Sequence, residues 1–384
     1  MQINIHSEIK QIPCDQWNSL VIDNNPFMRH EFLAALEKHG CVSDDFGWHP
    51  CHVAIYDDSD EQTKLIAAMP LYTKTNSYGE FVFDHAWADA YHRNQIPYFP
   101  KLVSAIPYTP ASGQRLLCEP GKANVLYPLL MQTAQQFAQE QNYSSFHCLF
   151  PVSDEQDWME NHGLLTRHDC QFHWHNQNYG NFEDFLAQLD KKKRKNIRQE
   201  RRRVAQQNIS IRVLNGHTAT DEDCANFAKF YDQTFAEKYG TATLNEGFFK
   251  QVAQKLPDQT LLVLADDPQG ECIAGSLMYA SDTTLYGRHW GCKEQIDKLH
   301  FEACYYQGID YCIANKLQHF EPGAQGEHKI ARGFIPTLTR SSHWLNKSPF
   351  QASIEDYVKH EQAGVKNYMK SLKSPYKDND KECG

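Results

Sequence analysis

The residues that decide the fold are Thr260-Leu-Leu-Val-Leu-Ala265, a short apolar run that predicts a buried strand. The run is followed by Asp266-Asp-Pro-Gln-Gly270, whose proline and glycine are typical of a turn. Two further strands are expected at Cys272–Ala280 and Thr284–Gly291, because only the short connection Ser281-Asp-Thr283 separates them. The three strands together predict a meander.

A helix is expected directly after this meander. Residues at spacings of three and four form one buried face: Phe301, Cys304, Tyr305, Gly308, Ile309, Cys312, Ile313 and Leu317. Gln318-His-Phe-Glu321 then predicts a short returning strand before Pro322 and Gly323. The order strand, strand, strand, helix, strand is similar to that of an acetyltransferase core.

The N-terminal half repeats this order more loosely. Strands are expected at Cys51–Tyr56, Leu65–Thr73 and Phe81–Asp84, an amphipathic helix at Val125–Gln141, and a returning strand at Ser145–Phe150. A chain of 384 residues also exceeds what one hydrophobic core usually supports. We therefore expect an α/β (α+β) protein of two tandem acetyltransferase-like domains, with mixed central sheets flanked by helices.

These elements predict the boundaries of the domains. The N-terminal domain is expected over residues 1–178 and a basic helix or linker over 179–207. The C-terminal domain is expected over 208–373 and a polar tail over 374–384.

The basic segment begins with Asn181, a predicted helix cap, and an apolar stripe continues from Phe182 through Val204. Between Lys191 and Arg203 the chain has nine Lys or Arg residues and one Glu, although its net charge is −10. Such a helix can contact the phosphates of a tRNA, the diphosphate of a nucleotide- or lipid-linked precursor, or anionic lipid headgroups; it can also be a solvated face. The candidate phosphate-binding or nucleic-acid-binding residues are Lys192, Lys193, Arg194, Lys195 and Arg198.

Several classes of protein are disfavoured by the sequence. The N-terminal residues lack the basic and apolar regions of a signal peptide, and no apolar stretch approaches the ~20 residues that span a bilayer, so we expect a cytoplasmic protein. The twelve cysteines form no Cys-x-x-Cys pair. His173 and His175 form one close pair without a third ligand at a recognisable spacing, so no metal is expected.

Two segments carry a resemblance to a known family. His300-Phe-Glu-Ala-Cys-Tyr-Tyr-Gln-Gly308 and Glu321-Pro-Gly-Ala-Gln-Gly-Glu-His-Lys-Ile-Ala-Arg-Gly-Phe334, with Lys191-Lys-Lys-Arg-Lys-Asn-Ile-Arg198 upstream, resemble the FemAB-like predicted N-acyltransferases. The resemblance implies transfer of an aminoacyl or acyl group to an amine of a peptidoglycan-type precursor. It also implies an aminoacyl-tRNA or an acyl-CoA as donor substrate, with no tightly bound cofactor.

Coenzyme A is the less favoured donor. Acetyl-CoA enzymes of this superfamily usually carry Gln/Arg-x-x-Gly-x-Gly/Ala at a helix start, where backbone N–H groups bind the pyrophosphate. No segment of this chain has that spacing, and Gly323-Ala-Gln-Gly326 leads into a charged stretch instead.

The densest group of candidate site residues follows the last predicted strand. Glu327 and His328 are candidate proton acceptors, and Lys329 and Arg332 are candidate ligands for a phosphate or carboxylate of a substrate. Gln325 has an amide that suits contact with a peptide. A solvated loop is the alternative interpretation.

Other candidates lie near the predicted strand end and the following helix start. Arg288 and His289 end the third strand of the meander, where ligands of open α/β sheets tend to bind. His300 and Glu302 lie in the first helical turn, where Glu302 also interacts favourably with the helix N-terminus. A hydrogen-bonded histidine and a helix-stabilising glutamate are the structural alternatives.

Two adjacent tyrosines are assigned to different faces of this helix, because neighbouring helical residues are about 100° apart. Tyr305 belongs to the apolar stripe and is expected in the core. Tyr306 is expected at the surface, where it is a candidate substrate-binding residue.

Two alternatives to aminoacyl or acyl transfer remain open at this point. One is a protein of the same fold that binds peptidoglycan fragments or RNA without catalysing a reaction. The other is an N-acetyltransferase that uses acetyl-CoA.

Overall fold

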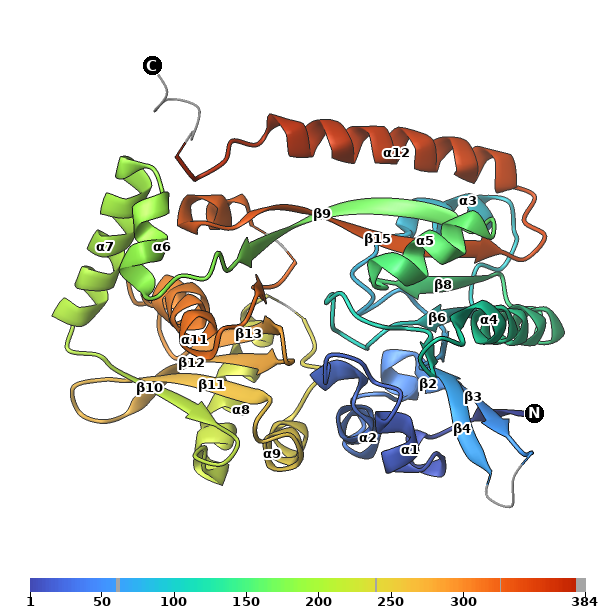
Figure 1. Ribbon diagram of the computed structural model, residues 1–384, viewed down its shortest axis with the longest axis horizontal. Helices are drawn as coiled ribbons and strands as arrows, with labels where there is room; N and C mark the ends of the chain where they lie inside the picture. Colours follow the sequence, from blue (N-terminus) through green and yellow to red (C-terminus); the bar gives the residue numbers. More distant parts are fainter. Residues whose placement is uncertain (60–62, 239, 325, 378–384) are drawn as a thin grey trace. The chain divides into compact units, whose positions relative to one another are not determined.

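The meander of the C-terminal half is present in the computed structural model, which describes residues 1–59, 63–238, 240–324 and 326–377 (Figure 1). It belongs to a unit formed by Cys170–Thr337 and the described residues from Tyr368 on. The strands of this unit, in spatial order, are β10 (Ser210–Asn215), β11 (Thr260–Asp266), β12 (Cys272–Ala280), β13 (Thr284–Cys292), β14 (His319–Glu321) and β9 (Leu165–His175). All neighbours pair antiparallel except β13 and β14, which are parallel.

Helices cover both faces of this sheet, because β11 and β12 are apolar on both sides. The helices are α6 (Phe182–Gln188), α7 (Lys191–Gln206), α8 (Asp221–Glu237), α9 (Glu246–Lys255), α10 (Leu299–Phe301) and α11 (Gln307–Asn315). On one face Val263 and Met278 pack with Ile309 of α11. On the other face Leu262 and Leu277 lie against Phe227 of α8 and Phe249 of α9.

The other unit consists of Met1–Asp169 and Leu338–Asn367. One sheet has the order β1 (Gln2–His6), β3 (His52–Asp57), β4 (Lys64–Met69), β7 (Leu117–Cys118). A second set of strands has the order β15 (Ile335–Leu345), β8 (Ser145–Leu149), β6 (Lys101–Ser104), β5 (Tyr72–Lys74), β2 (Trp48–Pro50). Its helices are α1 (Cys14–Asn18), α2 (His30–Lys38), α3 (His85–Arg93), α4 (Ala123–Glu140), α5 (Ser153–Asn161) and most of α12 (Gln351–Ser371).

The α/β class is confirmed. In each half a helix is followed by a returning strand that is parallel to an earlier strand of the same sheet: β8 with β6, and β14 with β13. In the N-terminal half the strands before that helix belong to two sheets, and β7 lies between β6 and α4 in the sequence, so the expected order holds only in part. The amphipathic pattern of Val125–Gln141 corresponds to α4, whose buried face contacts β3, β4 and β8.

Two strand predictions in the N-terminal half were wrong. The segment Leu65–Thr73 forms two strands rather than one, because Pro70 has no N–H for the strand ladder and separates β4 from β5. Phe81–Asp84 is not a strand: Phe81 has a φ of +60°, which is incompatible with extended backbone. The strand that pairs parallel with the returning strand β8 is β6, which begins at Lys101.

The basic segment forms two helices rather than one continuous helix. Asn181 caps α6 as expected, through a hydrogen bond from the Asp184 N–H to its side chain. The helix then ends at Gln188, because Leu189 is extended and forms a β-bridge with Tyr376. α7 starts afresh at Lys191.

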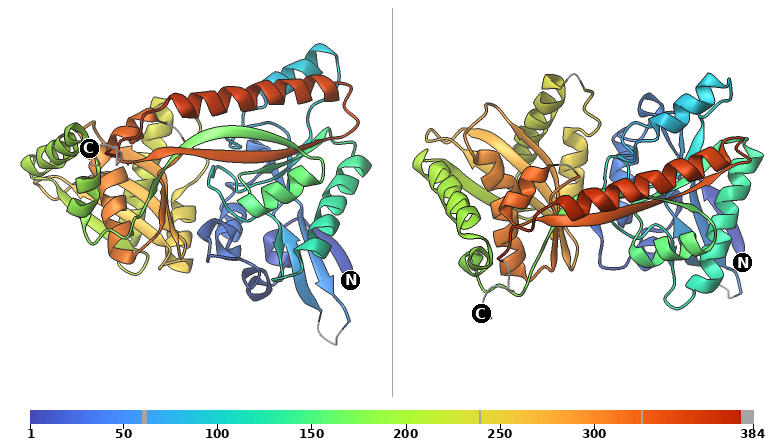
Figure 2. Two further views of the ribbon diagram at one scale, coloured as in Figure 1. Left: turned by 45° about the horizontal axis from the view of Figure 1, so that its top comes forward. Right: turned by 90° about the horizontal axis from the view of Figure 1, so that it is seen from above.

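The C-terminal segment also differs from the expected boundaries. Leu338–Asn367 packs with the N-terminal residues: in this unit α12 lies along β9, where Glu361 pairs with Arg167 at 2.6 Å (Figures 1 and 2). In the other unit the Tyr376 hydroxyl donates to the Gly333 carbonyl at 2.7 Å, so residues 374–377 are packed. A pattern of apolar residues does not reveal which sheet a late segment joins. Within the described ranges, no helix has both the length and the apolar character that a bilayer crossing requires.

Candidate functional site

The candidate site lies where β13 and β14 separate. The two strands pair only from Thr284 with His319 to Tyr286 with Glu321. Beyond this point β13 has a bulge at Arg288, since Leu277 of β12 pairs with His289 and Met278 pairs with Gly287. The parallel strands thereby diverge and leave a cavity of about 250 Å³.

Glycine at position 287 is needed for this geometry. A Cβ atom there would stand 3.1 Å from the Cα of Pro322, which follows β14. Gly287 therefore allows the two strands to approach closely at the base of the cavity. Gly287 and Pro322 both line it.

Titratable side chains from four segments converge on this cavity. They come from β13, α10, the π-helical turn Glu302–Tyr306 and the 3-10 turn Glu327–Arg332, and they are Arg288, His289, His300, Cys304, Tyr305, His328 and Lys329. Five of these seven were candidates in the sequence. Cys304 and Tyr305 were not, because their positions on the apolar stripe assigned them to the core.

The three imidazoles of the cavity are biased toward the neutral form. Burial lowers the pKa of His289 well below 6.5. Burial and the charges of His328, Arg332 and Lys329 lower the pKa of His300 to about 4. The pKa of His328 is lowered by the same kind of desolvation and by Arg332 and Lys329. Neutral imidazoles can accept protons at pH 7.

His328 and Lys329 are held in place by specific hydrogen bonds. The Tyr305 hydroxyl lies 2.8 Å from Nε2 of His328, and the partner that carries the shared proton depends on the tautomer. Nζ of Lys329 donates to the Gly323 carbonyl at 2.6 Å, and burial lowers its pKa to about 8. The ammonium of Lys329 thus fixes the loop after β14.

Tyr306 and Arg332 do not line the cavity. The hydroxyl of Tyr306, which is fully buried rather than exposed as expected, donates to Glu200 of α7. Arg332 donates to the other oxygen of Glu200 at 2.8 Å, and its guanidinium lies 3.4 Å from the ring centroid of Phe301. Tyr306 thus attaches α7 to the helix after β13, and Arg332 attaches α7 to the turn Glu327–Arg332.

Glu302 also attaches α7 to the helix after β13. It accepts from Arg201 of α7 at 3.0 Å and from Gln307 at 2.7 Å, and Arg201 also pairs with Asp310. Glu302 is buried. Its carboxylate therefore lies away from the cavity.

Glu327, the other candidate proton acceptor, lies outside the cavity. Glu327 is exposed and accepts a hydrogen bond from the Tyr368 hydroxyl at 2.6 Å, without lining the cavity. Gln325 lies outside the described residues.

Tyr305 is buried in the core as expected, but Tyr306 is buried as well, and the shape of the helix after β13 explains this difference from the prediction. Its residues Glu302–Tyr306 form a π-helical turn, which holds more residues per turn than an α-helix. The rotation of every following side chain therefore departs from the 3.6-residue period. Tyr305 thereby reaches His328, whereas Tyr306 points to Glu200.

The cations of α7 divide into paired and unpaired groups. Arg198 pairs with Glu183, Arg201 with Glu302, and Arg203 with Asp297. Lys192 and Lys195 are exposed, whereas Lys193 and Arg194 are half-buried. In the part of the chain that the structure describes, none of the cations at positions 191–195 has an ion-pair partner within 4.0 Å. The N-terminal half of α7 is thus a cationic surface.

The histidine pair of β9 does not form a metal site with its neighbours. His175 Nδ1 lies 3.0 Å from His319 Nδ1, and His173 contacts Gln171. Among the described residues no three His, Cys, Asp or Glu side chains are placed to hold a metal ion together.

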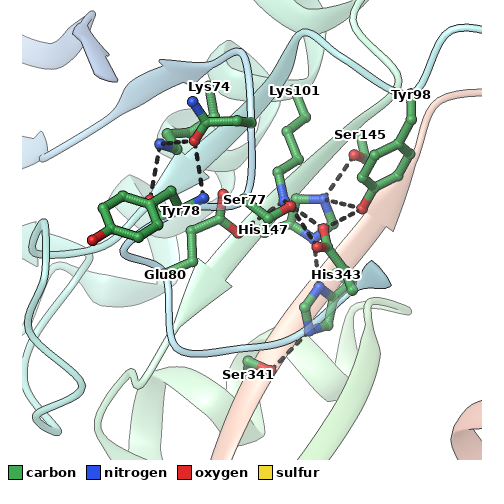
Figure 3. A network of polar contacts seen from close by, with 12 residues as sticks. Lys74, Ser77, Tyr78, Glu80, Tyr98, Lys101, Ser145, His147, Ser341 and His343 are labelled. Carbon is green, nitrogen blue, oxygen red and sulfur yellow. Dashed lines mark hydrogen bonds and ion pairs between the residues drawn. The ribbon is translucent and has the colours of Figure 1, made fainter. Parts of the chain in front are cut away.

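A second polar cluster, in the N-terminal unit, was missed in the sequence. Lys101 is fully buried and donates to Glu80 at 2.8 Å and to Asp84 (Figure 3). Burial raises the pKa of Glu80 to about 7. Burial alone would also raise the pKa of Asp84, but the Lys101 ammonium holds it below its usual value of 3.8. Tyr98 donates to the same Asp84 carboxylate at 2.5 Å.

Two buried histidines extend this cluster along facing strands. Nδ1 of His147 lies 2.5 Å from Nδ1 of His343, and each Nε2 contacts a serine: Ser145 at 2.7 Å and Ser341 at 2.8 Å (Figure 3). Burial lowers the pKa of both imidazoles well below 6.5. Lys101 and His147 each interrupt an otherwise apolar strand, which is the sequence signal that could have identified the cluster.

Comparison with solved structures identifies similar folds at low sequence identity. FemX aligns with a TM-score of 0.53 and 11% identity, over 92% of this chain and all of that chain. The C-terminal domain of a putative lysylphosphatidylglycerol synthetase from Agrobacterium fabrum aligns with a TM-score of 0.54 and 8% identity, over 90% of this chain and 95% of that chain. L-PGS from Bacillus licheniformis aligns with a TM-score of 0.50 and 11% identity, over 85% of this chain and 95% of that chain. These likenesses show the fold.

Comparison at the level of sequence gives two further results. No curated protein matches this chain significantly. A family model described as peptidoglycan biosynthesis/recognition matches residues 8–378.

Proposed function

Because that match spans nearly the whole chain, the protein belongs to the FemAB-like family, and from this membership we propose that it transfers an aminoacyl or acyl group to an amine of a peptidoglycan-type precursor. The observation that supports this most directly is the neutral imidazole of His328, hydrogen-bonded to Tyr305 in the cavity between β13 and β14. Transfer to an amine needs such a proton acceptor next to a binding cavity.

In the proposed reaction the acceptor amine attacks the donor's carbonyl carbon. A C–N bond forms, and the bond between that carbon and the donor's ester oxygen breaks. His328 takes one proton from the amine, and the leaving oxygen receives one. The Arg288 guanidinium, which the bulge of β13 places in the same cavity, is the proposed stabiliser of the developing oxyanion.

We propose an aminoacyl-tRNA as the donor in preference to an acyl-CoA. The connection from β13 to α10, residues 293–298, contains no glycine. It therefore lacks the glycine-rich loop whose backbone N–H groups usually bind a pyrophosphate. A reaction that uses aminoacyl-tRNA places the protein in the cytoplasm.

The cationic N-terminal half of α7 is the proposed contact for the donor's phosphates. We expect Lys192→Glu with Lys195→Glu to weaken tRNA binding and to lower the salt dependence of that binding by about one unit of slope for each lost phosphate contact. Both side chains are exposed, so the stability of the fold should not change. Filter binding of tRNA at several salt concentrations measures the effect.

The matched control is Lys229→Glu with Lys255→Glu, which changes the net charge equally on exposed positions of α8 and α9. Equal weakening by both pairs would mean that net charge alone attracts tRNA, and the assignment of α7 would fail. Vesicles with and without anionic lipid test the alternative that α7 contacts a membrane surface.

The reaction itself is tested with purified protein and labelled substrates. Mixed aminoacyl-tRNA or acetyl-CoA is incubated with a nucleotide-linked peptidoglycan precursor, and mass spectrometry detects the modified precursor. A mass increase by an aminoacyl residue supports the proposal. An acetyl product would identify an acetyltransferase instead, and precursor binding without any product would identify the recognition protein that the family description also allows.

A further inference from the structure

The N-terminal unit contains a cavity that the proposed reaction does not use. It has a volume of about 270 Å³ and lies between the unit's portions of β9, β15 and α12. Much of its lining is apolar: Val82, Phe83, Phe150, Tyr357 and Val365. Phe83 is 58% exposed at the cavity, so an entering molecule would cover it.

Three buried polar atoms of this cavity lack a hydrogen-bond partner among the described residues: Nη1 of Arg167, Oγ1 of Thr339 and Nδ1 of the half-buried His168. Nε and Nη2 of Arg167 donate to Glu361 at 2.8 and 2.6 Å, but its Nη1 has no hydrogen-bond partner among the described residues. Oγ1 of Thr339 likewise has no hydrogen-bond partner among the described residues. Arg167 and Thr339 are 7% and 4% exposed, and both line the cavity. Buried donors without partners are uncommon, because they lose their hydrogen bonds to water.

The polar side chains of Ser341 and Arg340, which lie beside these donors, already have partners. Ser341 follows Thr339 by two residues on the same face of β15, and its hydroxyl contacts His343 (Figure 3). Arg340 pairs with Asp157. Two carboxylates, Glu361 and the exposed Asp169, also line the cavity and offset much of its positive charge.

From this geometry we propose that the cavity binds a monoanionic carboxylate with an apolar body. Arg167 Nη1 and the Thr339 hydroxyl donate to the two carboxylate oxygens, and the apolar lining covers the rest of the molecule. A carboxylate fits better than a phosphate because Arg167 and Thr339 are the two buried residues of the described lining with an unpartnered donor, and Glu361 already balances the Arg167 charge. The inference concerns binding in the N-terminal unit and stands independently of the proposed transfer reaction.

This inference is tested by ligand-observed NMR, which compares the affinity of the protein for hexanoate with its affinity for uncharged hexanamide. Hexanoate is expected to bind at least tenfold more tightly than hexanamide, and inorganic phosphate is expected not to compete. Thr339→Val removes one donor at constant shape and should weaken hexanoate binding about tenfold, since hydrogen bonds to charged groups are strong. Its fold is expected to be retained, because the lost hydroxyl has no partner in the protein.

Two controls separate the carboxylate site from general effects. Thr133→Val removes a hydroxyl on α4 that contacts Leu129 and should leave the hexanoate affinity unchanged. Phe83→Glu places a negative charge at the cavity and should weaken hexanoate binding more than Phe83→Gln does. Equal binding of hexanoate and hexanamide, competition by phosphate, or unchanged affinity in Thr339→Val would each overturn the inference.

Discussion

Replacing His328 by glutamine is expected to lower the rate of the proposed transfer by about 100-fold or more, because a positioned general base contributes at least this factor. Binding of donor and acceptor should change little, since the variant keeps a polar side chain at the cavity. The rate is measured under single-turnover conditions with saturating substrates. A variant with an unchanged rate would remove His328 from the mechanism.

The pH dependence of the unaltered protein checks the same assignment. The pKa of His328 is lowered from 6.5 by burial and by Arg332 and Lys329, so its imidazole is neutral at pH 7. The rate should be level near pH 7 and should fall only as the pH drops below 6.5. Glu327→Gln is the matched comparison, because Glu327 is exposed, as His328 is, but pairs with Tyr368 outside the cavity. If Glu327→Gln abolished transfer and His328→Gln did not, the carboxylate would be the base.

Replacing Lys101 by methionine is expected to destabilise the fold by about 3–5 kcal/mol, because it leaves the buried Asp84 carboxylate without its cation. Urea unfolding followed by fluorescence measures the loss. The exposed pair of Lys293 with Glu271 provides the control, and Lys293→Met should cost less than about 1 kcal/mol. Similar losses in both variants would show that the Lys101 cluster is not a special determinant of stability.

Two further variants test the charges of this cluster. Adding Asp84→Asn to Lys101→Met should recover part of the loss, since only one of the two carboxylates, that of Glu80, then lacks its cation. Glu80 binds its proton more tightly in the folded state, where its pKa is about 7 rather than 4.5. The free energy of unfolding should therefore fall as the pH rises from about 5 to 8, and Glu80→Gln should reduce this fall.

The candidate site was only partly predictable. His328 and Lys329 could be located because they follow a predicted strand in a dense polar segment, and His289 and Arg288 because they end one. The sequence could not separate Glu327 from His328, which are neighbours in the chain but point to different surroundings. That choice depends on Tyr305 and Tyr368, which come from two other helices.

The sequence by itself determined the order of elements in the C-terminal half, the helix and returning strand of each half, and the cationic character of α7. These properties follow from local periodicity and from the position of turn residues, which act within a few residues of one another. Only the tertiary structure decided that Leu338–Asn367 packs with the N-terminal residues, that Lys101 meets Glu80 and Asp84, and that Glu200 holds Tyr306 and Arg332. Each of these results depends on side chains that are distant in sequence and meet only when buried, where an unpaired charge is costly and a specific partner is required.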